Sequence, residues 1–151
     1  MSAHIDIPIT STRSDKTRSL PRYMSRGAAG LDLAACIDEP ITIHPNTLAL
    51  IGTGYAVAIP EGYEGQVRPR SGLALKHQLG ILNSPGTIDS DYRGEIKIIM
   101  FNFGKESYTI SDNDRIAQLV ISALPQVKFK IVEHLDVTER GSGGYGHTGR
   151  E

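Results

Sequence analysis

Short apolar segments, interrupted by Gly, Pro, Asn and Asp, run along most of the 151 residues. Apolar and polar residues alternate in Ile5–Ile9, and continuous apolar runs occur at Leu48–Ile51 and Tyr55–Ile59. Both patterns are typical of short β-strands. Further strands are predicted at Gly65–Arg70, Glu95–Phe103, Ile116–Ala123 and Phe129–Glu133. With turn residues between them at the spacing of a sandwich or barrel, the pattern predicts an all-β fold.

Only Ser71–His77 has the pattern of a helix, with Ser71 as its N-cap and good helix formers behind it. Residues 11–26 are polar and basic, which suits an exposed loop. Residues 140–151 are too rich in glycine to fold alone. We therefore expect one β domain over residues 1–139, followed by a flexible arm over residues 140–151.

Composition narrows the possible partners. The formal net charge is -1, so no overall field attracts the chain to nucleic acid or to an anionic membrane. No segment has the length of a transmembrane helix, and the first residues lack the apolar centre of a signal peptide. We expect a cytoplasmic protein without nucleic-acid or membrane partners, in which locally placed Arg and Lys hold any anionic ligand.

Cysteine and histidine give little sign of metal or thiol chemistry. Cys36 is the single cysteine and follows a half-apolar run, which favours a buried, inert thiol over a nucleophile. The five histidines are scattered and show no paired spacing of zinc ligands.

The segment Arg68–Gly72 could form an anion site. A predicted strand delivers Arg68 and Arg70 to the start of the predicted helix, whose first N–H groups lack intrahelical partners. Gly72 would allow close approach of the backbone to a ligand. An ordinary strand-to-helix corner with solvated arginines explains the same residues.

The segment Asn83–Gly94 carries two carboxylates and an aromatic ring. Asp89 and Asp91 would share one face if extended, and either could polarise a water molecule as a general base. Tyr92 offers a flat surface for stacking. A hairpin turn rich in Asp and Gly is the alternative.

The glycine-rich tail does not belong to a known phosphate loop. Gly141, Gly143 and Gly146 match G-x-G-x-x-G by letter, but no strand and long helix surround them, as a dinucleotide fold requires. A P-loop motif is also absent. The tail is either disordered or a basic arm whose Tyr145 closes over a ligand.

Gln118, polar within an apolar run, is either a structural hydrogen-bonding residue or a ligand contact.

Taken in order, these stretches resemble the trimeric dUTP pyrophosphatases (dUTPases) over nearly the whole chain. The five motifs that carry the resemblance are Ala29–Leu33, Pro69–Ala74, Gly86–Gly94, Asp114–Leu119 and Arg140–Gly146. The resemblance implies a jelly-roll-like β-barrel that assembles as a homotrimer with active sites at the subunit interfaces. One subunit would supply the first, second and fourth motifs and a neighbour the third, while the exchanged C-terminal arm closes a site elsewhere in the trimer.

Two residues depart from the family pattern. Asn113 stands where a glycine is usual before the fourth motif, and asparagine is the next residue most tolerant of positive φ. Tyr145 stands where the fifth motif usually has phenylalanine, and a phenol ring stacks on a base as well as a phenyl ring does.

The resemblance implies hydrolysis of dUTP to dUMP and pyrophosphate. Asp89 would deprotonate the water that attacks the α-phosphorus in line. Mg²⁺ would bridge the phosphates, and Asp32 would contact it through water. The phosphates would be held by Arg70, Ser71, Gly72, Gln118, Arg140 and His147.

The resemblance also implies how the nucleoside is selected. The hairpin from Asn83 to Lys97, including Gly86, Thr87 and Ile88, would present backbone groups to the uracil edge. Tyr92 would pack under the sugar and exclude a 2′-hydroxyl, and Tyr145 and Gly146 would cover the base. Such an enzyme keeps uracil out of DNA and supplies dUMP for dTMP synthesis.

Two other functions fit the same scaffold. A dCTP deaminase resembles this family but uses a Glu to activate water at C4 of the base, whereas the Asp89 motif and the closing arm favour phosphate hydrolysis. A non-catalytic nucleotide-binding protein is the second alternative, and the joint presence of Asp89, Arg70 and Gln118 argues against it.

Overall fold

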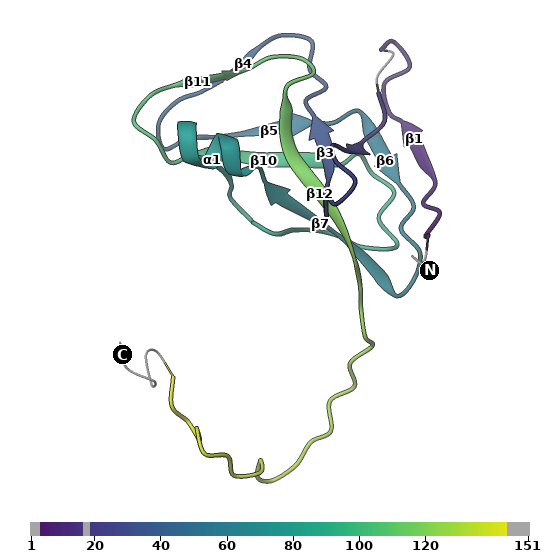
Figure 1. The fold of residues 1–151 in the computed structure, drawn as a ribbon, viewed down its shortest axis with the longest axis vertical. Coiled ribbons are helices and arrows are strands. Elements are labelled where there is room, and N and C mark those ends of the chain that lie inside the picture. The colour runs from purple at the N-terminus through teal and green to yellow at the C-terminus, as the bar shows by residue number, and fades with distance from the viewer. Residues whose placement is uncertain (1–3, 17–18, 145–151) are drawn as a thin grey trace.

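The protein is mostly β, with one short helix, as a computed structural model of residues 4–16 and 19–144 shows (Figure 1). Helix α1 (Ser71–His77) lies between β7 and β8 in the chain. The strands are β1 (Ile9–Ser11), β2 (Arg22–Tyr23), β3 (Leu31–Ala34), β4 (Ile41–Ile43), β5 (Leu48–Gly52), β6 (Tyr55–Val57), β7 (Tyr63–Pro69), β8 (Leu79–Ile81), β9 (Gly86–Ile88), β10 (Lys97–Asn102), β11 (Tyr108–Ile110) and β12 (Arg115–Ala123).

These strands form four open antiparallel sheets. The largest has the order β2-β3-β12-β7-β9, the second has the order β5-β10-β8, and β1-β6 and β11-β4 are separate pairs. The predicted all-β class is confirmed, but the closed barrel is not formed by the described residues. Closure requires a ladder that continues around the barrel. Here several strands have only two or three residues, so the ladder is broken into four parts.

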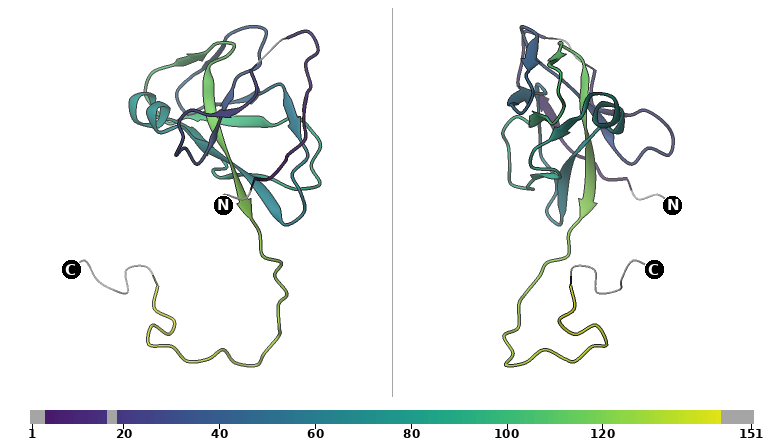
Figure 2. Two further views of the ribbon diagram at one scale, coloured as in Figure 1. Left: turned by 45° about the vertical axis from the view of Figure 1, so that its right-hand side comes forward. Right: turned by 90° about the vertical axis from the view of Figure 1, so that its left-hand side faces the viewer.

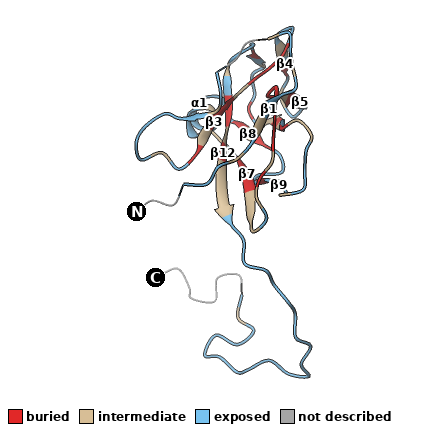
Figure 3. Ribbon diagram, turned by 90° about the vertical axis from the view of Figure 1, so that its right-hand side faces the viewer, coloured by how far each residue is buried: buried red, intermediate tan, exposed pale blue. Residues whose placement is uncertain are grey.

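The core is one cluster of buried side chains that come from strands of all four sheets. Figure 3 shows the buried segments within the domain and the exposed chain that follows β12. Leu33, Ile51, Ile98, Met100 and Ile116 are each 1% exposed or less. Burying one such side chain contributes about 1.5–3 kcal/mol. Every second residue of β10 is buried, because successive side chains of a strand point to opposite faces of the sheet. One face of β10 therefore packs in the core and the other lies nearer the surface.

The first and last predicted strands differ from the structure. The first strand is Ile9–Ser11 and pairs with β6, so it starts where the Ile5–Ile9 pattern ends. The segment Phe129–Glu133 is not a strand. After β12 the chain leaves the domain and runs away from it (Figures 1 and 2). Phe129 is 91% and Ile131 98% exposed, because none of the described strands lies beside them.

Helix α1 begins at the predicted residue but with a different cap. Arg70 occupies the N-cap with extended backbone, and its carbonyl accepts the N–H of Ala74 at 3.0 Å. Ser71 is therefore the first helical residue, and no side chain caps the helix. The helix ends at Gln78, whose φ of 51° places it in the left-handed region. A left-handed residue at this position lets the N–H of Gln78 bond back into the last turn.

Two single-residue expectations are confirmed. Asn113 has φ 68° in the turn before β12, the conformation for which asparagine was expected to replace glycine. Its N–H donates to the carbonyl of Ala35 at 3.0 Å, which ties this turn to the end of β3. Cys36 is a free, buried thiol. In the described part of the chain, no helix is long and apolar enough to cross a membrane.

Candidate active site

The first half of the candidate site is a polar cluster around Asp32. Asp32 on β3 and Gln118 on β12 are direct cross-strand partners, and Gln118 Nε2 donates to Asp32 Oδ1 at 3.0 Å. Arg70, immediately after β7, places its Nε 3.8 Å from Asp32 Oδ2. The structure thus brings together three predicted site residues that are far apart in the sequence.

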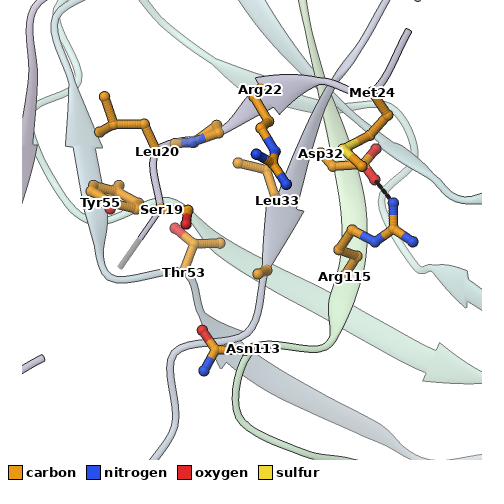
Figure 4. Close-up of a pocket in the computed structure, with 12 residues that line it drawn as sticks. Ser19, Leu20, Arg22, Met24, Asp32, Leu33, Thr53, Tyr55, Asn113 and Arg115 are labelled. Atoms are coloured by element: carbon orange, nitrogen blue, oxygen red, sulfur yellow. Dashed lines mark hydrogen bonds and ion pairs between the residues drawn. The ribbon is translucent and has the colours of Figure 1, made fainter. Parts of the chain in front are cut away.

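Arg115 is a fourth member of this cluster and was not singled out from the sequence. Its Nη1 donates to Asp32 Oδ2 at 3.0 Å, and its backbone carbonyl accepts Arg70 Nη1 at 2.8 Å. Figure 4 shows Arg115 and Asp32 bonded at the edge of a cavity of about 530 Å³. The available signal was a lone arginine at the start of an apolar strand that also carries Gln118.

The burial of Asp32 explains why it needs several partners. Its side chain is 5% exposed, and an isolated buried carboxylate is strongly unfavourable. Two arginines and one amide satisfy it. Arg70 and Arg115 together bring two positive charges to one negative charge, and their side chains remain 27% and 46% exposed. The cluster therefore keeps an excess positive charge that solvent or an anionic ligand can reach.

Ser71 and Gly72 continue this cationic surface. Both are exposed in the first turn of α1, directly after Arg70. The first turn contains no acidic residue that would repel an anion. A Cβ added at Gly72 would meet no atom within 4 Å, so packing within the chain does not require glycine here.

The second half of the candidate site is the turn after β9. Asp89 is exposed, and its carbonyl accepts the N–H of Tyr92 at 3.2 Å. The segment is thus a turn, and the extended arrangement of Asp89 and Asp91 is not formed. Tyr92 is 43% exposed, and its Oη donates to the carbonyl of Glu95 at 3.0 Å. Asp89 and Tyr92 thus belong to one exposed turn, in which the Glu95 carbonyl holds the hydroxyl end of the Tyr92 ring.

The remaining residues predicted to contact the nucleoside lie on β9, before it, and at the start of β10. β9 is the edge strand of the large sheet, so one side of its backbone is not used by that sheet. Gly86 and Ile88 are buried, whereas Asn83, Thr87 and Lys97 are exposed. β9 pairs with β7 and not with the residues that follow it. The expected Asn83–Lys97 hairpin is therefore not formed. These residues connect the antiparallel strands β8 and β10, and they include β9.

Within one chain, Asp89 and the Asp32 cluster are far apart. Ile88 pairs with Gly65 near the start of β7, whereas Arg70 follows the end of β7. Gly65 and Arg70 are separated by roughly 16 Å of extended strand. The strands β12 and β7 also lie between β3 and β9. Asp32 and Asp89 accordingly line different hollows of the surface.

The tail contributes one described residue to the predicted site. Arg140 is exposed and donates to the carbonyl of Gly143 at 2.7 Å, within the tail itself. Figure 2 shows the tail running below the domain, away from the sheets. Tyr145, Gly146 and His147 lie outside the described residues.

The described residues do not build a metal cage of their own. No group of three or more His, Cys, Asp or Glu side chains comes together in residues 4–16 and 19–144. Both oxygens of Asp32 already accept a hydrogen bond, although each retains a further lone pair. This donor set fits an ion held mainly by a ligand's oxygens and by water, as Mg²⁺ commonly is.

A separate charged cluster lies at the surface near the N-terminus. Arg13 donates to Asp15 at 2.8 and 2.9 Å and to Asp38 at 2.8 Å. The hydrogen bond from Arg13 lowers the pKa of Asp15 to about 2. Hydrogen bonds from Arg13, and then from Lys16, lower the pKa of Asp38 as well. The cluster fastens the first loop to the turn after β3.

Fold and site together define a small β protein whose exposed cationic cluster and separate exposed carboxylate suit an enzyme acting on an anionic ligand. Comparison with known proteins gives the family. The dUTPase family model matches residues 16–149. The chain belongs to the dUTPase family and is a hydrolase.

Relatives and solved structures support this assignment over most of the chain. The deoxyuridine 5'-triphosphate nucleotidohydrolase of Desulfotalea psychrophila is 56% identical, covering 91% of this chain and 91% of the relative. The same-named protein of Chlamydia pneumoniae is 58% identical, covering 89% and 94%. A dUTPase of Staphylococcus bacteriophage 80alpha, solved with dUpNHpp, is 29% identical with a TM-score of 0.86, covering 96% of this chain and 99% of the phage chain. A dUTPase of phage phi11 of S. aureus, described with a structural Mg(II) ion, is 26% identical with a TM-score of 0.77, covering 86% of this chain and 98% of the phage chain.

Proposed function

We propose that the protein hydrolyses dUTP to dUMP and pyrophosphate at sites shared between subunits of a homotrimer. The observation that carries the proposal is the exposed cationic cluster around buried Asp32, formed by the residues that match the family's first, second and fourth motifs. Family membership and the phage dUTPase solved with a dUTP analogue support the substrate.

The phosphates would bind at the Asp32 cluster. Arg70 donates from Nη1 to the Arg115 carbonyl, and its side chain is still partly exposed. Ser71 and Gly72 would add a hydroxyl and backbone N–H groups, and Gln118 would contact the phosphates or the attacking water. Because Asp32 neutralises only one of two arginine charges, the cluster favours a polyanion over a neutral ligand.

Asp89 would act as the general base. It takes a proton from water, whose oxygen forms a bond to the α-phosphorus in line as the bond to the bridging oxygen of pyrophosphate breaks. A carboxylate is a weak base, so positioning and charge neutralisation supply most of the rate. Asp32 would contact waters around Mg²⁺, which neutralises phosphate charge when bound.

The nucleoside would lie against β9 and the turn after it. The outward side of the β9 edge supplies backbone donors and acceptors that pair with uracil and leave cytosine mismatched. Gly86, Thr87 and Ile88 form that edge, and Asn83 and Lys97 flank it. The Tyr92 ring would pack against C2′ of the deoxyribose and leave no room for a hydroxyl.

The distance between the two halves of the site supports a shared active centre. A base must come within about 3 Å of the water it deprotonates. Asp89 and Arg70 of one chain lie at opposite ends of β7, so Asp89 would serve phosphates held by a neighbouring subunit.

The segment after β12 supports exchange between subunits. Val127, Phe129 and Ile131 are 72%, 91% and 98% exposed and alternate with polar residues. This is the pattern of a strand with one apolar face, which needs a neighbouring surface. We infer that it packs on another subunit and carries the arm over residues 140–151 to that subunit's site, where Arg140, Tyr145, Gly146 and His147 would close on the nucleotide. The enzyme would thereby keep uracil out of DNA and supply dUMP for dTMP synthesis.

One assay tests this function. The protein is incubated with Mg²⁺ and with dUTP, dCTP, dTTP or UTP, and pyrophosphate and ammonia are measured. We expect pyrophosphate from dUTP and little from the other three nucleotides. Ammonia from dCTP would instead identify a deaminase, and the absence of both products would leave a nucleotide-binding protein.

A further inference from the structure

Glu95 occupies an unusual position beside the turn that carries Tyr92. Its side chain is 21% exposed, and its Oε1 accepts the backbone N–H of Gly54 at 2.8 Å. It also lies over Gly52, where an added Cβ would approach the Glu95 Cδ to 3.3 Å. The carboxylate is thus seated on the turn between β5 and β6, although Glu95 itself precedes β10.

The backbone of Glu95 holds Tyr92. The Tyr92 Oη donates to the Glu95 carbonyl at 3.0 Å, so the far end of the ring is tied to this residue. A Cβ added at Gly94 would collide with the Tyr92 ring, so the hydroxyl end of the ring lies directly over Gly94. The backbone of Tyr92 is held by the hydrogen bond from its N–H to the Asp89 carbonyl.

Two hydrogen bonds hold Ile96, the residue that follows Glu95. Thr53 Oγ1 donates to the carbonyl of Ile96 at 2.7 Å, and Ile96 N–H donates to the carbonyl of Tyr55 at 2.8 Å. These bonds fix the chain just after Glu95. The hydrogen bond from Gly54 N–H to the Glu95 carboxylate holds the chain just before Ile96, on the side toward Tyr92.

We propose that Glu95 is a positioning residue that sets discrimination between deoxyribose and ribose by fixing the height of the Tyr92 ring. The inference rests on the proposed function, in which this ring packs against C2′ of the sugar. When the carboxylate is removed, the peptide that carries the Glu95 carbonyl keeps its anchor only on the Ile96 side. The carbonyl and the ring bonded to it then shift away from the sugar, and room opens for a 2′-hydroxyl. Glu95 itself touches no substrate atom.

The test compares kcat/KM for dUTP and UTP in full-length Glu95→Ala, Glu95→Gln and Glu39→Ala proteins. Glu95→Ala should lower the dUTP/UTP ratio about five- to tenfold, chiefly by raising the rate with UTP. Glu95→Gln keeps an oxygen that accepts the Gly54 N–H and should restore the ratio. Glu39→Ala removes an exposed glutamate from another turn and should leave the ratio unchanged. An equal loss of rate for both nucleotides in Glu95→Ala would overturn the proposal.

A double-mutant cycle tests the route through Tyr92. Tyr92→Phe removes the hydroxyl that reaches the Glu95 carbonyl, so Glu95→Ala should change the ratio much less in that background. The same change in both backgrounds would overturn the proposed route. A wild-type protein that does not hydrolyse dUTP contradicts the proposed function itself, and this result is separate from one in which wild type is selective and Glu95→Ala is equally selective.

Discussion

Gln118 and Asp32 face each other across β12 and β3, with the amide nitrogen of Gln118 donating to Asp32 Oδ1 at 3.0 Å. Gln118 thereby supplies one of the three partners of a buried carboxylate and remains half-buried at the edge of the cationic cluster. Its structural role and its proposed role in ligand binding are therefore coupled.

Replacing Gln118 should cost both stability and activity. In Gln118→Ala, Asp32 Oδ1 loses its donor, and a buried acceptor left unpaired costs about 1–3 kcal/mol. Urea unfolding measures this loss, and steady-state assays with dUTP measure the accompanying fall in kcat/KM. Gln66→Ala, which removes a half-buried glutamine from the neighbouring strand β7, is the matched control. Full stability in Gln118→Ala would contradict a structural role for this hydrogen bond.

Asp89→Asn should abolish turnover without loss of nucleotide binding. The side chain is exposed, and the residue bonds within its turn only through its backbone, so the fold should be unaffected. Loss of a general base typically lowers the rate about 10²–10⁴-fold. Calorimetry with dUTP and a pyrophosphate assay separate binding from chemistry. Asp91→Asn, also exposed in the same turn, is the control, and equal inactivation by both substitutions would assign the effect to the turn.

Two inactive variants should complement each other if sites are shared. Arg70→Ala removes the arginine proposed to bind the phosphates, and Asp89→Asn removes the proposed base at the other end of β7. A mixed trimer contains some sites with Arg70 from one subunit and Asp89 from a neighbour, so unfolding and refolding the two variants together should restore part of the activity. No recovery in trimers shown by mass spectrometry to be mixed would place both residues in one subunit's site.

A chain ending at residue 139 should fold and assemble but hydrolyse dUTP slowly. Residues 140–144 are exposed or half-buried and contribute nothing to the buried core, so thermal stability should be retained. The loss should fall mainly on kcat, because in the proposed function the arm closes over the bound nucleotide. Analytical ultracentrifugation checks assembly. Undiminished turnover by the shortened protein would remove the arm from the mechanism.

Arg13→Ala should raise the pKa of Asp15 from about 2 toward its ordinary value of 3.8. The folded pKa is depressed, so the contribution of this pair to stability is present above pH 3.8 and is lost as pH falls toward 2. The pKa of Asp38 should rise less far, because Lys16 still bonds to it. NMR titration of the carboxyl carbons measures both values. Arg13→Lys keeps the charge without the two-pronged contact and should give an intermediate shift.

The sequence predicted the long strands and the helix because their patterns are local. Leu48–Ile51, Ile116–Ala123 and Ser71–His77 correspond to β5, β12 and α1 almost residue by residue. Strands as short as β2, β8 and β9 have two or three residues and carry no period of their own. They exist only because a longer strand pairs with them, which a local pattern does not encode.

Part of the candidate site could likewise be predicted from the sequence, and part of it could not. Asp32, Arg70 and Gln118 could be named from family motifs, and the structure brings them together. Arg115 could not be named from its local sequence, because its role depends on how β12 pairs with β3. It lies opposite Ala34, and its side chain reaches from there to Asp32 on the same strand. The open sheets and the exposed segment around Phe129 could not be inferred either, since both depend on which strands pair over long distances in the sequence.

In the part of the chain that the structure describes, residues 124–144 add nothing to the buried core. Substitutions there leave the packing of the domain unchanged, so under the proposed function they would act through closure and assembly. The tail can change its length, charge or aromatic residue while the domain continues to fold unchanged. Such separation lets one scaffold acquire new turnover rates or new regulation by altering a terminal segment alone.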